Sequence, residues 1–321
     1  MAIKRGRPVT QEFDNGPALT SKEFEALFDE LKTWSDYSPE VLERGALNHI
    51  NADVIKNAAS TVTLGQIVHM ALPWNTVSGP DNAKPATHYM VSLAQFENPE
   101  PTSNRDFIGV DYHGKAVSHM DAPTHIIYRG DIFGGKKSID HVTTEGSHWA
   151  SIDKLGPVVT RGILLDAALL REVNYLEPGT AIHAADVLAM EEKFGFTISQ
   201  GDCVLLRSGH FARRDAVGVW NPDNLSAGFH VDVMKLFKER KVSVIGADGD
   251  SDVRPSPVEG VESPIHALAL PGMGIPLLDN LQLEALAKVC VAQKRWSFQI
   301  ILAPLNIPRG TGSPLNPVAV F

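Results

Sequence analysis

The second half of the chain alternates between apolar and amphipathic segments, and this alternation limits the folds that it can adopt. Residues 201–209 (GDCVLLRSG) and 242–249 (VSVIGADG) are short, apolar and bounded by turn residues, which is typical of buried strands. A helical pattern over 230–241 lies between them. Helices that alternate with strands indicate an α/β fold. By the same criteria, strands are predicted over 61–72, 88–96, 156–168 and 297–307, and helices over 184–195 and 281–294.

Two further helices are predicted before the first of these strands. Thr20 and Glu23 have the spacing of a capping box, and apolar residues at helical spacing follow them. A shorter helix is expected over about 46–58. The predicted division is an N-terminal arm and helical extension over 1–60 and one main domain over 61–321.

Composition and charge exclude several classes of protein. The 321 residues include 29 basic and 38 acidic ones, for a net charge of −9, and no basic cluster of the kind that binds nucleic acid. No run approaches 18 apolar residues, so we expect no membrane span. The two cysteines, Cys203 and Cys290, lie in apolar surroundings and predict buried thiols and a reducing compartment. With no apolar run after the basic N-terminal residues, we expect a cytoplasmic protein.

The stretch HGKAVSHMDAPTHI, residues 113–126, concentrates polar side chains beside a proline. In an extended segment His119 and Asp121 point to the same side, and His125 joins them unless the chain bends at Pro123. Imidazole and carboxylate groups in this arrangement are ligands for zinc, manganese or a similar divalent ion. The alternative is a hydrogen-bonded loop in which Asp121 caps a turn, and the spacing alone leaves both interpretations open.

A metal needs further ligands from elsewhere in the chain. The segment ESPIHALALPGMGIPLLDNL supplies His266 and Asp279, both in Pro- and Gly-rich chain where functional side chains often lie. The alternative role for Asp279 is to cap the helix predicted after it.

A second acidic run, DGDSDVRPSPVE, resembles a calcium-binding loop in its spacing alone. Its sixth position is Val253 where such a loop needs glycine, two prolines follow, and a strand precedes it, so we do not expect a calcium site. Carboxylates just past the end of a strand do, however, often line a cleft in α/β folds.

With these segments in view, the sequence resembles the cyclase family of metal-dependent hydrolases, which includes bacterial kynurenine formamidase and isatin hydrolase. The family motif H-x-G-T-H-x-D-x-P-x-H is matched by residues 115–125 (KAVSHMDAPTH), and the downstream element Glu-Asn-Leu by Asp279-Asn280-Leu281. The segments GDCVLLRSG, VSVIGADG and the ending APLNIPRGTGSPLNPVAVF are also similar. The resemblance covers roughly residues 60–321.

The resemblance implies a swivelling β/β/α fold, a homo-oligomer and a divalent metal that serves hydrolysis. It implies that His119, Asp121, His266 and Asp279 are metal ligands and that His125 is the catalytic acid and base. Lys115 stands where the motif has its first histidine, which removes a ligand. We therefore expect one metal ion per chain, with Lys115 helping to stabilise an oxyanion, although His113 offers an alternative imidazole nearby.

The function expected on this basis is hydrolysis of a C–N bond in a small amide or cyclic amide. A lactone hydrolase needs the same parts and is the first alternative, and a metal-binding protein without catalytic activity is the second. The substrate is expected to be a small molecule. The aromatic residues Trp74, Phe107, Trp149, Phe211 and Trp220 are candidates for an apolar pocket, with the hydrophobic core as the alternative for each.

Overall fold

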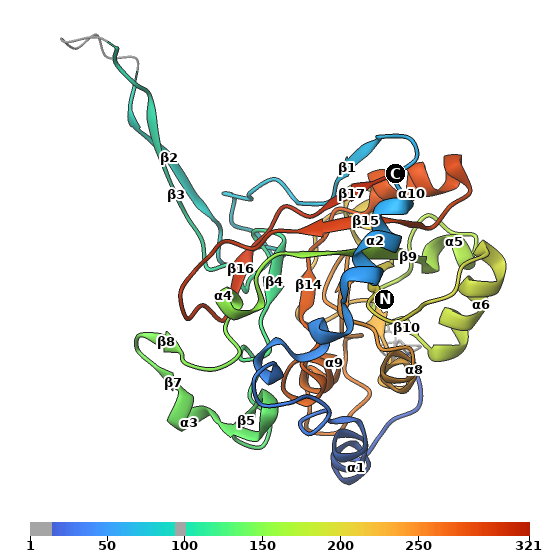
Figure 1. Ribbon diagram of the computed structural model, residues 1–321. Coiled ribbons are helices and arrows are strands. Elements are labelled where there is room, and N and C mark those ends of the chain that lie inside the picture. Colours follow the sequence, from blue (N-terminus) through green and yellow to red (C-terminus); the bar gives the residue numbers. More distant parts are fainter. Residues whose placement is uncertain (1–14, 94–100) are drawn as a thin grey trace, which may run out of the picture.

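The computed structural model describes residues 15–93 and 101–321 (Figure 1). Within these residues nine strands form one sheet: β1 (Ile67–His69), β4 (His119–Asp121), β9 (Val158–Asp166), β11 (Cys203–Arg207), β13 (Val244–Ala247), β14 (Leu277–Asp279), β15 (Ser297–Leu302), β16 (Gly312–Pro314) and β17 (Val318–Val320). Their order across the sheet is β1–β17–β15–β9–β11–β13–β14–β4–β16. Strands β9, β11, β13 and β14 are parallel, and the pairs outside this group are antiparallel. The predicted α/β fold is confirmed.

The helices cover the sheet. The α-helices are α1 (Ser21–Leu31), α2 (Ala52–Ser60), α3 (Ser138–His141), α4 (Ile152–Leu155), α5 (Ala167–Leu170), α6 (Ala184–Phe194), α7 (His210–Val217), α8 (Val233–Glu239), α9 (Pro264–Ala267) and α10 (Glu284–Gln293). The 3₁₀ segments are η1 (Leu42–His49) and η2 (Phe133–Gly135), and η3 (Leu268–Met273) is a π-helix. Among the residues that the structure describes, no helix is both long enough and apolar enough to cross a membrane.

Short strand pairs lie outside the main sheet: β5 (Asp131–Ile132) with β6 (Lys136–Lys137), β7 (Val142–Thr143) with β8 (Gly146–Ser147), and β10 (Ala181–Ile182) with β12 (Gly228–Phe229). A longer hairpin of β2 (Thr87–Ser92) and β3 (Arg105–Gly109) projects away from the body of the molecule (Figure 1). It exposes large apolar side chains, among them Tyr89, Val91 and Ile108.

The central strands are buried on both faces, which explains their nearly continuous apolar sequence. In β11, Cys203 and Leu205 pack into one hydrophobic cluster, and Val204 and Leu206 pack into a second. Because successive side chains of a strand point to opposite faces, the sheet separates these two clusters. Both cysteines are free and buried, as predicted.

Truncation of Leu205 tests this burial. The side chain is fully buried in the middle of β11. We expect Leu205→Ala to lower the free energy of unfolding by about 2–5 kcal/mol, because it leaves a cavity in the core. Chemical denaturation measures the change. Leu188→Ala is the control, since Leu188 lies on α6 with 46% of its surface exposed; equal losses in the two variants would contradict the assigned burial.

The N-terminal extension is part of the same core. Helix α1 begins after Thr20, whose side chain forms the predicted capping box with Glu23, and Phe24 and Phe28 of this helix are buried in the larger cluster. The prediction of one helix over 46–58 is wrong. Asn51 accepts hydrogen bonds from two backbone N–H groups at the start of α2, and this cap begins a new helix after η1.

Two predicted strands are shorter than expected. Of residues 61–72, only Ile67–His69 forms a strand, because the preceding backbone turns at Gly65 (φ +68°), where two N–H groups donate to the Phe321 carbonyl. The strand predicted over 88–96 corresponds to β2, and residues 94–96 lie outside the described part of the chain.

Candidate metal centre

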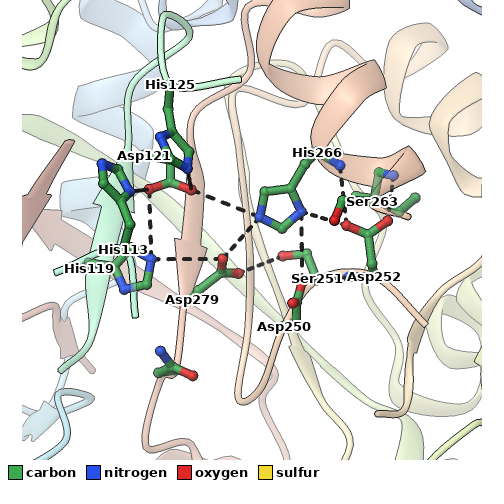
Figure 2. Close-up of polar contacts among 12 residues, drawn as sticks. His113, His119, Asp121, His125, Asp250, Ser251, Asp252, Ser263, His266 and Asp279 are labelled. Atoms are coloured by element: carbon green, nitrogen blue, oxygen red, sulfur yellow. Dashed lines mark hydrogen bonds and ion pairs between the residues drawn. The ribbon is translucent and has the colours of Figure 1, made fainter. Parts of the chain in front are cut away.

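The pairing of β4 with β14 brings together the two segments that carry the predicted ligands. The strands are antiparallel, with Asp279 opposite His119 and Leu277 opposite Asp121. His119 and Asp121, two positions apart on β4, therefore project to the side on which Asp279 also lies (Figure 2). All three side chains are buried. The alternative role of Asp279 as a helix cap is wrong, because α10 begins at Glu284 with Leu283 at the N-cap position.

His266 reaches the same point from α9. Its backbone N–H and that of Ile265 donate to the carboxylate of Asp252, which fixes the start of this short helix. The imidazole then lies between Asp252 on one side and Asp279 on the other (Figure 2). The structure thus brings together all four predicted ligands.

The donor atoms lie close enough together to hold a small cation, with Asp121, His266 and Asp279 forming one group and His113, His119 and Asp121 a second that shares Asp121. His266 Nε2 lies 3.2 Å from Asp279 Oδ2 and 3.9 Å from Asp121 Oδ2. His119 Nε2 lies 3.7 Å from Asp121 Oδ1 and 3.9 Å from Asp279 Oδ2. Ligand atoms about 2.1 Å from one ion are roughly 3.0–3.4 Å apart, so a modest contraction would complete the coordination. Oxygen and imidazole nitrogen together suit zinc or manganese.

The ligand imidazoles are oriented through their other ring nitrogens. Nδ1 of His266 lies 2.5 Å from Asp252 Oδ2, and Nδ1 of His119 lies 3.3 Å from the Val117 carbonyl oxygen. Donation from each Nδ1–H leaves the Nε2 lone pair facing the centre, as in the carboxylate–histidine–metal arrangement of many metal sites. The Ser251 hydroxyl similarly donates to Asp279 Oδ1 at 3.1 Å.

The centre concentrates negative charge in a buried place. Burial opposes protonation of His266, but the carboxylates of Asp279 and Asp252 outweigh burial and raise its pKa well above the usual value. Burial likewise opposes ionisation of Asp121, yet the neighbouring histidines, with His125 foremost, hold the pKa of this carboxyl below its ordinary value. The carboxylates around His266 therefore favour a positive charge at its Nε2, which fits the divalent ion predicted from the sequence.

His125 lies beside the centre and outside the closest group of donor atoms. Its Nε2 is 3.9 Å from Asp121 Oδ2, and its ring stacks on that of His113 with 3.6 Å between the centroids. His113 itself donates or accepts through both nitrogens, with Nδ1 2.7 Å from Asp121 Oδ1 and Nε2 2.8 Å from Thr311 Oγ1. His113 thus positions Asp121 and supports His125.

Lys115 points into the site and not to solvent. Its Nζ lies 3.4 Å from Asp250 Oδ2 and 3.6 Å from Asp223 Oδ1. Burial lowers the pKa of this amine, but Asp250 and its neighbouring carboxylates outweigh burial and raise the pKa above its ordinary value. The side chain is therefore an ammonium group at neutral pH.

These residues line a cavity of about 350 Å³. It includes the four predicted ligands together with Lys115 and His125, so every predicted site residue faces one space. Asp250 and Arg254 also line it, and their side chains form an ion pair of 2.9 Å. The sequence offered His113 as an alternative imidazole, and the structure places it beside His119 and Asp121. The sequence did not assign roles to Asp250 or Asp252. The position of the two aspartates after a strand pointed to a cleft, but no spacing indicated that Asp252 would hold His266.

Comparison with known proteins gives the family. A family model described as putative cyclase matches residues 85–251, which is more than half of the chain. The chain belongs to the cyclase family. The matched region includes the segment that carries His119, Asp121 and His125. None of the curated proteins compared with the chain matches it.

Several solved structures share the fold of this cyclase-family protein. A protein described as a novel cyclase superposes with a TM-score of 0.81 at 23% identity, over 92% of this chain and 99% of the other. Isatin hydrolase A from Ralstonia solanacearum gives a TM-score of 0.55 at 23% identity, over 80% and 92% of the two chains. Isatin hydrolase A from Labrenzia aggregata gives 0.53 at 22% identity, over 83% and 97%. At these identities the likeness concerns the fold.

Proposed function

We propose that this protein is a metal-dependent hydrolase that cleaves a C–N bond of a small amide or cyclic amide with water. One observation carries the proposal. Asp121, His266 and Asp279 form one buried group that could hold an ion, His119 lies within 4 Å of both carboxylates, and His125 and Lys115 face the same cavity. The fold likeness to two isatin hydrolases, which are named for a cyclic amide substrate, supports this choice of bond.

Different side chains of the cavity would bind the metal, transfer the proton and stabilise the oxyanion in such a reaction. His119, Asp121, His266 and Asp279 would hold a divalent ion, which supplies Lewis acidity and lowers the pKa of a coordinated water from 15.7 towards about 7. His125 is placed to accept a proton from the attacking water and to return it to the leaving nitrogen. The Lys115 ammonium group is placed to donate a hydrogen bond to the substrate carbonyl oxygen as negative charge develops there.

Burial keeps His125 neutral and therefore able to accept a proton. Burial lowers the pKa of this imidazole to about 4, against an opposing effect of Asp121. Stacking on His113 restricts the rotation of the ring, so its Nε2 remains directed towards the Asp121 side of the cavity. A proton carrier held in this way needs little reorganisation during the reaction.

A substrate panel tests the proposed function. The metal-loaded protein is assayed with isatin, with formanilide as an open-chain amide, and with a γ-lactone. We expect hydrolysis of at least one amide with kcat/KM at least about tenfold above that for the lactone. Preference for the lactone would support a lactone hydrolase instead. Absence of turnover on all three, with metal bound, would favour a binding protein and contradict the proposal. The homo-oligomer and the cytoplasmic location remain predictions.

We also propose that the metal centre of each chain binds one ion. A second ion there would need a further ligand at the position of Lys115, whose ammonium group has no lone pair to offer. The expected stoichiometry is one tightly bound ion in the wild type and two in Lys115→His, measured by elemental analysis after dialysis. Lys84→His is the matched control, because Lys84 is exposed at the rim of the same cavity. Two ions in the wild type would contradict the proposal.

A further inference from the structure

Two histidines lie side by side outside the metal cavity, just past the ends of two paired strands. Strands β10 and β12 are parallel, with Ile182 opposite Phe229. The backbone N–H of His230 continues this pairing, because it donates to the Ile182 carbonyl at 2.9 Å. His183 and His230 therefore occupy neighbouring positions, and their ring centroids lie 4.5 Å apart. Neither residue lines the metal cavity.

A carboxylate faces both rings. Asp232 Oδ2 lies 2.8 Å from Nδ1 of His183 and 3.3 Å from Nδ1 of His230. The other oxygen, Oδ1, accepts a hydrogen bond of 3.1 Å from the backbone N–H of Ala184, which fixes the carboxylate at the start of α6. Among the residues that the structure describes, no lysine or arginine forms an ion pair with Asp232. We call His183, His230 and Asp232 the histidine–aspartate cluster.

The hydrogen bonds of His230 place its proton on the far side of the ring. Nε2 lies 3.3 Å from the carbonyl oxygen of Pro17, which can only accept, so Nε2 carries the N–H. Nδ1 accepts from the backbone N–H of Asp232 at 3.3 Å, so it presents a lone pair towards Asp232 Oδ2. An imidazole whose other nitrogen donates to a carbonyl oxygen is oriented as metal-binding histidines are. A cation between Nδ1 and Oδ2 would satisfy both electron-rich atoms.

The facing atoms of the cluster have nearly the separations of ligands around one small ion. Ligands about 2.1 Å from zinc lie roughly 3.0–3.4 Å apart. The two distances from Asp232 Oδ2, 2.8 and 3.3 Å, are close to this range, and one ligand atom from each residue lies within 4.8 Å of the others. A further position is open to water, because the side chains of His183 and Asp232 are 27% and 43% exposed.

The N-terminal segment lies against the two rings. Gly16 has a φ of +82°, and a Cβ atom there would lie 2.7 Å from Cε1 of His183 and 2.8 Å from Cδ2 of His230. Leu19 then donates its backbone N–H to the Pro257 carbonyl at 2.8 Å. An ion that fixes these rings would therefore also hold the N-terminal segment on the main domain.

We propose that the histidine–aspartate cluster binds one zinc ion through Nδ1 of His183, Nδ1 of His230 and the Asp232 carboxylate, with water as the fourth ligand. Imidazole nitrogen with one carboxylate suits zinc, whereas magnesium and calcium prefer oxygen ligands alone. The ion takes the place of the hydrogen bond between His183 and Asp232, and the ring proton of His183 moves to its Nε2. Zinc here stabilises the fold, because it joins the starts of α6 and α8.

This zinc ion is separate from the ion of the metal centre and is bound less tightly. The cluster offers three protein ligands at a partly exposed place, whereas the metal centre offers four buried ones. The zinc ion of the cluster is therefore lost on dialysis against metal-free buffer, and one tightly bound ion per chain remains.

The test counts metal ions at equilibrium. Protein with its metal centre loaded is dialysed against free zinc at increasing concentrations up to about 0.1 mM, and total metal is measured by elemental analysis. We expect the wild type to rise from one ion per chain to two. His183→Ala and Asp232→Asn should stay at one, because each removes a ligand of the cluster. His69→Ala, which removes an exposed imidazole on β1, should rise to two as the wild type does.

Thermal unfolding gives an independent measure that does not depend on activity. Added zinc should raise the midpoint of the loaded wild type by about 2–5 °C and leave both cluster variants unchanged, and magnesium should raise none of them. Asp232→Asn guards against a simple loss of folding, since the amide keeps the oxygen that accepts from Ala184. A wild type that stays at one ion, or a second ion that persists in both cluster variants, would overturn the proposal and leave the metal centre untouched.

Discussion

Removal of the divalent ion is expected to abolish hydrolysis and to destabilise the protein at the same time. The centre holds two buried carboxylates beside two imidazoles, and without a cation their charges repel one another in a poorly screened place. Treatment with a chelator should lower kcat/KM by at least about 10²-fold, and added Mn²⁺ or Zn²⁺ should restore it. A ligand at a hundred times its Kd stabilises the folded state by about 2.7 kcal/mol, so the thermal midpoint should also fall on chelation and recover on reloading.

Asp279→Asn is the variant that matches this experiment. The amide keeps the shape of the side chain but removes a charge opposite His119. We expect metal binding to weaken by at least about 10–100-fold, the loss typical when only an outer partner of a ligand is removed, together with the loss of activity. Ser313→Ala serves as the control for a change in the same part of the sheet, since Ser313 is buried on β16 and lies outside the cavity. Full activity of a preparation that elemental analysis shows to be free of metal would reject the metal-dependent mechanism.

His125→Ala is expected to separate catalysis from metal binding. The imidazole lies 3.9 Å from Asp121 and lines the cavity, but it is not among the groups of donor atoms that converge closely enough for an ion. Loss of its proton transfer should lower kcat by about 10²–10⁴-fold, with KM little changed and with one ion still bound. Steady-state kinetics and elemental analysis of the same preparation measure both quantities.

The His125 experiment has two informative controls. His69→Ala makes the same substitution at an exposed position of β1 and should leave kcat unchanged. His113→Ala removes the ring that stacks on His125 and the partner of Asp121, so it should lower both metal affinity and kcat. If His125→Ala lost its metal together with its activity, His125 would be a ligand and the assignment of the proton carrier would fail.

The sequence by itself was sufficient for the α/β class and for the residues that the structure brings together at the candidate metal centre. Buried parallel strands must be apolar on both faces, so β9, β11 and β13 appear as short apolar runs between turn residues. A capping box is local, and the start of α1 was therefore predictable from Thr20 and Glu23. The placement of His119 and Asp121 was also predictable from the local sequence, because side chains two residues apart in a strand lie on the same side.

Local patterns failed where a contact from a distant part of the chain sets the structure. Only three residues of 61–72 form a strand, because the carbonyl of the last residue, Phe321, holds the turn before it. The helix predicted over 46–58 is divided at Asn51, and η1 before it packs its Gly45 against the backbone of Gly274. Neither neighbour can be inferred from the residues within the segment itself.

Tertiary structure alone decided which acidic and basic groups act together. The antiparallel pairing of β4 with β14 places Asp279 opposite His119 across 160 positions of sequence, and no spacing rule connects the two. The carboxylate of Asp252 holds His266 only because the chain after β13 returns beside α9. Lys115 likewise keeps its charge in a buried place because Asp250 and Asp223 face it. Residue type sets what a side chain can do chemically, while the charges and ligands around it come from strand register and loop packing, which depend on the whole fold.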